Sequence, residues 1–201
     1  FIGKNLIPIL LKDNHKITLI IKHSLKIKNQ KWIKKLNLIY ADFLSDKTFF
    51  FNEKFDILIH LAWSNLDNYN HKSHKNELKF HKNFINLAIK SKIKHFIFSG
   101  TCQEYGLKEG ELNERMQTNP TTNYSVSKNK LRKFIFNKQK KNKLYIQWLR
   151  IFYLMGKFQS KKTLFGQLEC HLKSKKKSFK MSSGEQIRDY LDVKKLCEII
   201  S

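Results

Sequence analysis

A tyrosine and a lysine stand four residues apart in the segment Asn-Tyr-Ser-Val-Ser-Lys, where Tyr124 precedes Lys128. On a helix, residues at this spacing lie one above the other on the same face, so the phenol and the ammonium group can reach one pocket. The positive charge is expected to pull the pKa of Tyr124 below its usual value of about 10. Such a tyrosine can exchange a proton with an alcohol near neutral pH. The bare pair also fits an exposed helical face, because both residue types are abundant here.

Short apolar runs alternate with longer amphipathic segments along the chain. Runs of this length without strict polar alternation are typical of strands buried on both faces, and they lie at 17–21, 38–41, 56–62, 95–100 and 144–152. Helices are expected at 2–14, 66–91 and 122–141, with Pro8 tolerated only near the first turns. This alternation predicts an α/β fold with a doubly wound parallel sheet.

The polar segments fall where such a sheet binds ligands, beyond the carboxyl ends of its strands. Residues 60–65 follow one expected strand, residues 99–106 follow the next, and residues 123–128 begin the helix after that. The tyrosine and lysine are therefore expected at this edge of the sheet.

Length and composition favour one folded domain with its own core. The chain has 201 residues, of which 41% are hydrophobic. No apolar run approaches the roughly 20 residues that span a membrane, and the first residues lack the order of a signal peptide. Cys102, Cys170 and Cys197 match neither a disulfide framework nor a zinc spacing. A reducing cytoplasm is the expected location.

The formal net charge of +24 points to phosphate-bearing partners, on nucleic acid, an anionic membrane or a small substrate. Lys, Ile, Asn and Phe are used heavily throughout, as expected where an A+T-rich genome biases permissive surface positions. The densest basic runs, at 138–143 and 173–177, indicate helix ends and a loop rather than a stripe interleaved with aromatic residues. We therefore expect neither a nucleic-acid nor a membrane partner.

The order of seven segments resembles the extended short-chain dehydrogenase/reductase family, the NAD(P)-dependent epimerases and dehydratases of nucleotide sugars. The segments are FIGKNL at 1–6, ADF at 41–43, HLAW at 60–63, FSGTCQEYG at 98–106, YSVSK at 124–128, LRIFYLMG at 149–156 and RDYLDV at 188–193. The resemblance implies a Rossmann-type doubly wound parallel sheet that lacks its first strand, with part of a small C-terminal substrate domain. We expect an NAD(P)-binding domain over 1–155 and the start of a substrate-binding region, interleaved with it, over 156–201. The chain resembles a fragment of a longer protein.

The resemblance also assigns cofactor contacts. They are Phe1, Ile2, Gly3, Lys22, His23, Asp42, Phe43, Leu61, Ala62, Tyr124 and Lys128. Gly3 would let the first helix pack close to the sheet while its N-terminal amides face the pyrophosphate. Lys22 and His23 stand where an NAD-binding fold places a carboxylate, and two cations suit the 2′-phosphate of NADP better. NADP or NAD is expected, with NADP slightly favoured.

Thr101, Tyr124 and Lys128 match the catalytic triad of this family. The resemblance implies that Thr101 orients the sugar oxygen, Tyr124 exchanges the proton, and Lys128 tunes the phenol and holds the nicotinamide ribose. Relatives that dehydrate sugars carry Asp and Glu directly after this threonine, whereas Cys102 and Gln103 occupy those positions here. Dehydration is disfavoured, and Glu104 one step later keeps it open.

Arg188 matches the arginine that binds the nucleotide diphosphate of the substrate, and a surface salt bridge with a neighbouring aspartate is its alternative. Tyr153 stands where relatives usually have an asparagine that contacts the substrate, so the sugar and nucleotide stay open. His71, His74 and His81 fit a solvated helix face better than a metal site, and no metal is expected.

These residues predict an NAD(P)-dependent nucleotide-sugar epimerase or 4-ketoreductase for polysaccharide precursors, acting as a homodimer when full length. The alternative is an inactive Rossmann-type protein that binds nucleic acid or other polyanions through its basic surface.

Overall fold

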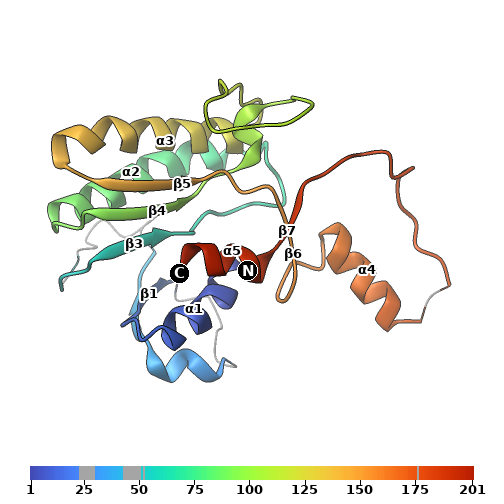
Figure 1. Ribbon diagram of the computed structural model, residues 1–201, viewed down its shortest axis with the longest axis horizontal. Helices are drawn as coiled ribbons and strands as arrows, with labels where there is room; N and C mark the ends of the chain where they lie inside the picture. The colour runs from blue at the N-terminus through green and yellow to red at the C-terminus, as the bar shows by residue number, and fades with distance from the viewer. Residues whose placement is uncertain (23–29, 43–50, 52, 176) are drawn as a thin grey trace. The chain divides into compact units, whose positions relative to one another are not determined.

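The computed structural model describes residues 1–22, 30–42, 51, 53–175 and 177–201 (Figure 1). Among these residues the chain forms two compact units. The terminal unit takes in Phe1–Leu19, Lys26–Leu38 and Phe152–Ser201, and the central unit takes in Ile20–Leu25 and Ile39–Ile151, in their described parts. The expected domain division after residue 155 stays a prediction.

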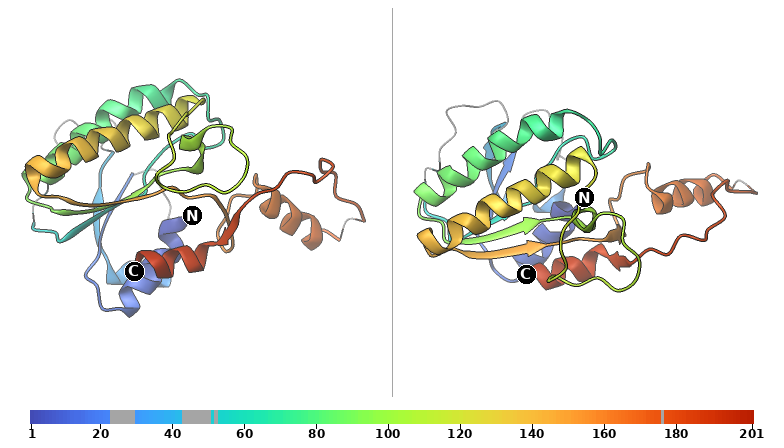
Figure 2. Two further views of the ribbon diagram at one scale, coloured as in Figure 1. Left: turned by 45° about the horizontal axis from the view of Figure 1, so that its top comes forward. Right: turned by 90° about the horizontal axis from the view of Figure 1, so that it is seen from above.

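The central unit is built on a parallel three-stranded sheet. Its strands are β3 (Ile57–His60), β4 (His95–Ser99) and β5 (Tyr145–Leu149), with β4 in the middle. Helices α2 (Ser73–Lys90) and α3 (Asn123–Asn142) lie side by side over one face of this sheet (Figures 1 and 2). The α/β class with parallel pairing is confirmed.

The core of the central unit lies between these helices and the sheet. Apolar side chains recur on α2 and α3 at steps of three and four, which places them on one face of each helix. The buried cluster consists of Ile85, Ala88, Ile93, Phe96, Phe98, Leu131, Ile135 and Leu144. Because β4 is covered on this face and flanked by two strands, its position is fixed from several sides.

The terminal unit packs α1 (Ile2–Lys12) against α5 (Val193–Ile200). It also contains the short parallel pair β6 (Tyr153–Met155) and β7 (Tyr190–Asp192), and helix α4 (Leu164–Lys173). Among the described residues, no helix is both long and apolar enough to cross a bilayer.

Strands β1 (Thr18–Ile21) and β2 (Asn37–Tyr40) pair with each other, and a 3₁₀ helix, η1 (Lys31–Lys35), precedes β2. The Asn37 N–H donates to Ile17 O, and the Ala41 N–H donates to Ile21 O. Residue numbers thus rise together along the two strands, as in a parallel pair.

One helix prediction needs correction. The helix expected from residue 66 begins at Ser73, because Asn65 adopts a left-handed conformation (φ 51°) and the following residues form turns. Pro8 lies inside α1 within its first two turns, as expected. The Pro8 side chain is exposed, and its missing N–H removes one hydrogen bond from the helix.

Candidate active site

The site begins where β4 ends, at Gly100 and Thr101, followed by the 3₁₀ helix η2 (Cys102–Tyr105). The Gly100 N–H donates to Leu149 O at 2.6 Å. A Cβ on residue 100 would stand 2.8 Å from Leu149 O and nearer still to the Trp148 indole. A side chain there would push this segment away from β5 and displace Thr101.

Helix α3 supplies the tyrosine and the lysine. Its N-cap residue Thr122 accepts the Ser125 N–H at 3.1 Å, and the Ser125 hydroxyl accepts the Thr122 N–H at 3.1 Å. This reciprocal cap fixes the first turn, which carries Tyr124. Lys128 lies one turn further on the same face, as the spacing predicts.

Tyr124 is buried, with 9% of its surface exposed. The Tyr69 ring stacks on its phenol ring at 5.4 Å, and the Thr101 side chain stands beside the phenol. Burial raises the pKa of Tyr124 above its usual value, the charges of Tyr69 and Glu104 add to this, and the Thr101 side chain lowers it as a hydrogen-bonding group. The expected lowering of this pKa is therefore wrong for this structure, because desolvation outweighs the charge four residues away.

Lys128 is 1% exposed, and its ammonium donates to Ser99 O at 2.7 Å. The same Nζ lies 4.3 Å from the centroid of the Trp63 ring and 5.9 Å from that of Tyr124. Burial lowers the pKa of Lys128 to about 7, although the Glu104 carboxylate works in the opposite direction. The lysine can thus change charge near neutral pH.

Glu104 is fully buried and its carboxylate is occupied by several donors. Oε1 accepts the Thr101 N–H at 3.0 Å and the Trp148 indole N–H at 2.9 Å. Oε2 lies 3.4 Å from Nε of both Arg132 and Arg150. A carboxylate held in this way is poorly suited to deliver or remove a substrate proton, so Glu104 does not support dehydration.

The histidines of α2 do not lie on a solvated face. His74 and His81 are completely buried, which corrects the sequence interpretation for both. The Trp63 ring stacks on His81 at 4.2 Å, and its indole N–H donates to His74 Nδ1 at 3.0 Å. The His74 Nε2–H in turn donates to Asn68 O at 2.9 Å, which fixes a neutral tautomer. Within the described residues, no three His, Cys, Asp or Glu side chains gather as a metal site requires.

Known proteins match the chain over almost its whole length. The sequence profile of the NAD dependent epimerase/dehydratase family matches residues 1–201. The chain belongs to this family. The resemblance to extended short-chain dehydrogenases/reductases is thereby confirmed, and the family consists of enzymes.

The individual relatives described next share only about a fifth to a quarter of their residues with this chain. A dTDP-6-deoxy-L-talose 4-dehydrogenase (NAD(+)) of Aggregatibacter actinomycetemcomitans is 26% identical over 205 residues, covering 98% of this chain and 73% of that protein. The UDP-N-acetylglucosamine 4-epimerase of Methanobrevibacter ruminantium shares the fold with a TM-score of 0.83 at 20% identity, covering 98% of this chain. The UDP-glucuronic acid 4-epimerase of Bacillus cereus, solved with UDP-glucuronic acid and NAD, has a TM-score of 0.80 at 21% identity over 98% of this chain. The chain spans 67% and 68% of these two structures.

The cofactor contacts expected from the family divide between the two units. Lys22 and Asp42, at the ends of β1 and β2, form an ion pair of 3.1 Å. Ala62 is exposed and, with Leu61, directly follows β3. His23 and Phe43 lie outside the described residues. In the terminal unit, Phe1 is the N-cap of α1, and Ile2 and Gly3 form its first turn.

Arg188 belongs to the terminal unit and is exposed. Its guanidinium donates to Ile187 O at 3.0 Å and lies 5.4 Å from the centroid of the Tyr153 ring. The two sequence features that concern the substrate, Arg188 and the unusual Tyr153, are therefore neighbours. Asp192, an alternative partner for Arg188, instead caps α5 through the Lys194 N–H at 2.6 Å.

Several residues of the site were missed by sequence reasoning. Trp63 and Tyr69 line Tyr124, and Arg132 and Arg150 bind Glu104. Trp63 and Arg150 do stand in the segments HLAW and LRIF that carry the family resemblance. Nothing in the sequence indicates that Arg132 lies against Glu104, because this contact joins α3 to η2.

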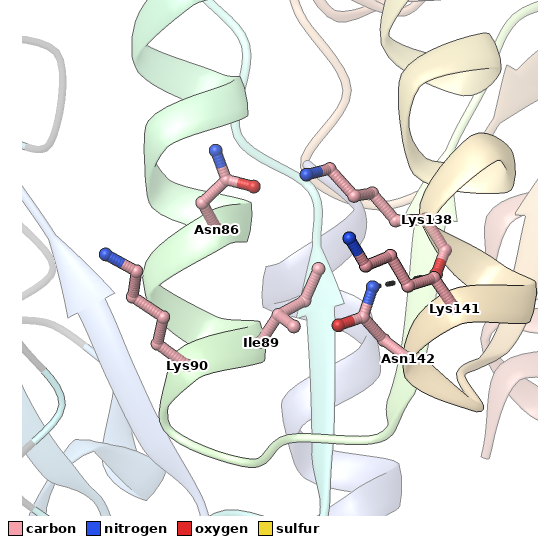
Figure 3. A pocket seen from close by; sticks show the side chains of 6 residues that line it. All are labelled: Asn86, Ile89, Lys90, Lys138, Lys141 and Asn142. Atoms are coloured by element: carbon pink, nitrogen blue, oxygen red, sulfur yellow. Dashed lines mark hydrogen bonds between the residues drawn. The ribbon is translucent and has the colours of Figure 1, made fainter.

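A surface pocket of about 380 Å³ lies away from these residues, between the C-terminal turns of α2 and α3 (Figure 3). Its lining consists of Asn86, Ile89, Lys90, Lys138, Lys141 and Asn142. Lys138 is 14 residues from Tyr124 along α3, or roughly 21 Å. The pocket is therefore not part of the proposed catalytic site.

Proposed function

We propose that this protein is an NAD(P)-dependent nucleotide-sugar epimerase or 4-ketoreductase, with Tyr124 as the general acid and base. One observation carries the proposal. The Tyr124 phenol has the buried Thr101 side chain beside it and shares a helix face with the fully buried Lys128, where the parallel strands end. This grouping offers one hydroxyl to orient a sugar oxygen and another to exchange its proton.

Tyr124 is the proposed proton carrier. Because burial raises its pKa, the phenol keeps its proton at neutral pH and can donate it to a sugar ketone oxygen. In the oxidative direction the phenol must first lose this proton before it takes one from a sugar hydroxyl. The nearby Lys128 ammonium favours that loss, because a positive charge stabilises phenolate.

The residues at the ends of β1 and β2 fit the adenosine end of a nicotinamide dinucleotide. When bound, this cofactor supplies the hydride acceptor or donor. Asp42 offers oxygens to ribose hydroxyls, and the part-exposed Lys22 offers a charge to a 2′-phosphate. NADP stays slightly favoured in this proposal, because a lysine rather than a carboxylate follows β1.

The cofactor preference is tested by replacing Lys22. Lys22→Ala should weaken NADP binding about tenfold and leave NAD within about twofold, because only NADP loses a charge pair with its 2′-phosphate. Titration of both cofactors measures this, and Lys35→Ala, an exposed lysine outside the strands, is the control. Equal losses for NADP and NAD would show that Lys22 does not distinguish them.

We do not propose dehydration. Cys102 and Gln103 occupy the positions of the dehydratase acid and base, and the Gln103 side-chain oxygen already accepts the Thr122 hydroxyl at 3.2 Å. An epimerase recycles its cofactor, whereas a reductase consumes it. The absorbance of reduced nicotinamide during turnover therefore separates the two activities.

Tyr124→Phe in the full-length protein tests the proposed chemistry. The change removes only the phenolic hydroxyl, which carries the transferable proton, so kcat should fall by about two to four orders of magnitude while the circular dichroism spectrum is kept. Turnover is followed with a panel of UDP- and dTDP-sugars, the nucleotides in the names of the relatives. Tyr145→Phe, at an exposed strand position, is the control. Near-normal turnover of Tyr124→Phe would exclude Tyr124 as the acid and base.

The substrate is proposed to be a nucleotide sugar whose diphosphate contacts Arg188. The support is the exposed guanidinium of Arg188, held beside Tyr153, together with its place in the segment RDYLDV. A homodimer of the full-length protein and a reducing compartment stay proposals, the latter because Cys102, Cys170 and Cys197 form no disulfide.

A further inference from the structure

We infer that Glu104 is a positioning residue, whose buried carboxylate fixes Thr101 and thereby aligns the Tyr124 phenol with the substrate. The inference deepens the proposed function and rests on it. Glu104 does not touch the reacting groups in this role. It acts through the backbone of Thr101.

The carboxylate is held by donors from three different elements. The Thr101 N–H comes from the end of β4, Arg132 comes from α3, and Trp148 and Arg150 come from the end of β5. Because these elements belong to one packed unit, the carboxylate has a single place that satisfies all of its donors.

Each arginine is itself fixed from a second side. Arg132 donates through Nε and Nη2 to Asn129 Oδ1 at 3.2 and 3.0 Å. Arg150 donates to Glu114 O at 3.1 Å, and its guanidinium lies 4.5 Å from the centroid of the Tyr105 ring. Neither guanidinium is therefore free to follow a displaced carboxylate.

Both polar groups of Thr101 are constrained by the same short helix. Its N–H donates to Glu104, and its hydroxyl accepts the Gln103 N–H at 3.3 Å, in a capping box around η2. The same side chain stands beside the Tyr124 phenol. Releasing the Thr101 N–H would loosen the hydroxyl, and small misplacements of catalytic groups lower rates strongly.

Stability alone does not account for this arrangement. A buried ion cluster contributes little to stability compared with apolar side chains of similar volume, whereas it specifies geometry well. Glu104 also influences the site electrically, because its charge raises the pKa of both Tyr124 and Lys128. The other ionisable groups that face Tyr124 are Tyr69, Cys102 and His74, whose ring centroid lies 5.4 Å from that of Tyr124.

The test compares Glu104→Gln and Glu104→Asp in the full-length protein. Glutamine keeps the shape and removes the charge, so kcat should fall at least tenfold, the KM for the nucleotide sugar should stay within twofold, and the pH profile should move to lower pH. Aspartate keeps the charge but is shorter, so kcat should fall while the pH profile stays that of the wild type. Glu109→Gln, an exposed glutamate in the adjoining loop, should change none of these values.

A folded Glu104→Gln protein with wild-type kcat and pH profile would overturn the inference. If that protein does not fold, Glu104→Asp decides: a lowered kcat at wild-type KM supports positioning, and a wild-type kcat excludes it. The hydrogen bond from the Thr101 N–H to Glu104 can be tested without measuring activity, by following amide hydrogen exchange in the ¹⁵N-threonine-labelled wild type. The Thr101→Ser variant assigns the Thr101 signal. The Thr101 amide should exchange with solvent much more slowly than that of the exposed Thr121, and equal rates would overturn the inference even if Tyr124→Phe is inactive.

Discussion

Lys128 combines a charge with almost complete burial, and this combination gives the site its pH dependence. Its ammonium has one carbonyl partner, Ser99 O, and the faces of two aromatic rings. These contacts do not replace the lost hydration, so the pKa of Lys128 falls to about 7. A lysine at this position is retained at a cost in stability, as expected for a functional group.

Because burying Lys128 lowers stability, replacing it should raise the free energy of unfolding by an amount that depends on pH. Between pH 10.5 and 7 the unfolded chain binds a proton that the folded lysine does not, so wild-type stability falls as the pH is lowered and is lowest below pH 7. Lys128→Met should raise the free energy of unfolding by about 1–4 kcal/mol at pH 6, and the gain should shrink toward pH 10. Urea unfolding at several pH values measures it. The exposed Lys130→Met on the same helix should show no such trend, and a gain independent of pH would refute the explanation.

At the scale of elements, the first turn of α3 connects helix stability with the site. The Thr122 cap holds the turn that carries Tyr124, and Tyr69 O accepts the Tyr124 N–H at 2.9 Å. Helix α4 has a similar cap, in which the Thr163 hydroxyl accepts the Gly166 N–H at 3.2 Å. Removing each cap in turn can therefore separate an effect of lower protein stability from an effect of a misaligned Tyr124.

Thr122→Ala and Thr163→Ala should each cost about 1 kcal/mol, because each leaves a helix N–H without its side-chain partner. Only Thr122→Ala should also lower kcat, by about threefold to tenfold, through fraying of the turn that carries Tyr124. Urea unfolding and steady-state kinetics on both variants provide the measurements. A similar kcat loss in Thr163→Ala would attribute the effect to general destabilisation.

For the whole molecule, phosphate binding through the overall net charge of +24 must be distinguished from phosphate binding at one arginine, Arg188. Binding through many lysines is steeply salt-dependent and changes little on one conservative substitution. Binding through Arg188 depends on the planar guanidinium, which forms two parallel bonds to a diphosphate where a lysine offers a point charge.

Arg188→Lys in the full-length protein should therefore raise the KM for the nucleotide sugar about tenfold, with cofactor affinity within twofold. A salt series with a fluorescent oligonucleotide and a nucleotide sugar provides the comparison, and Lys194→Arg is a surface control. Tight, strongly salt-dependent oligonucleotide binding without nucleotide-sugar binding would favour the inactive polyanion-binding alternative.

The sequence by itself determined the α/β class, the placement of all five expected strands and the shared helix face of Tyr124 and Lys128. These features depend on local periodicity, on the spacing of helical turns and on the order of short motifs, all of which are properties of neighbouring residues. Only the tertiary structure decided the protonation of Tyr124, the burial of His74 and His81, and the partners of Glu104. Desolvation and charge pairing depend on which distant elements cover a residue. The burial of Lys128 beneath Trp63 and the binding of Glu104 by Arg132 and Arg150 arise only when β3, α3 and β5 pack together.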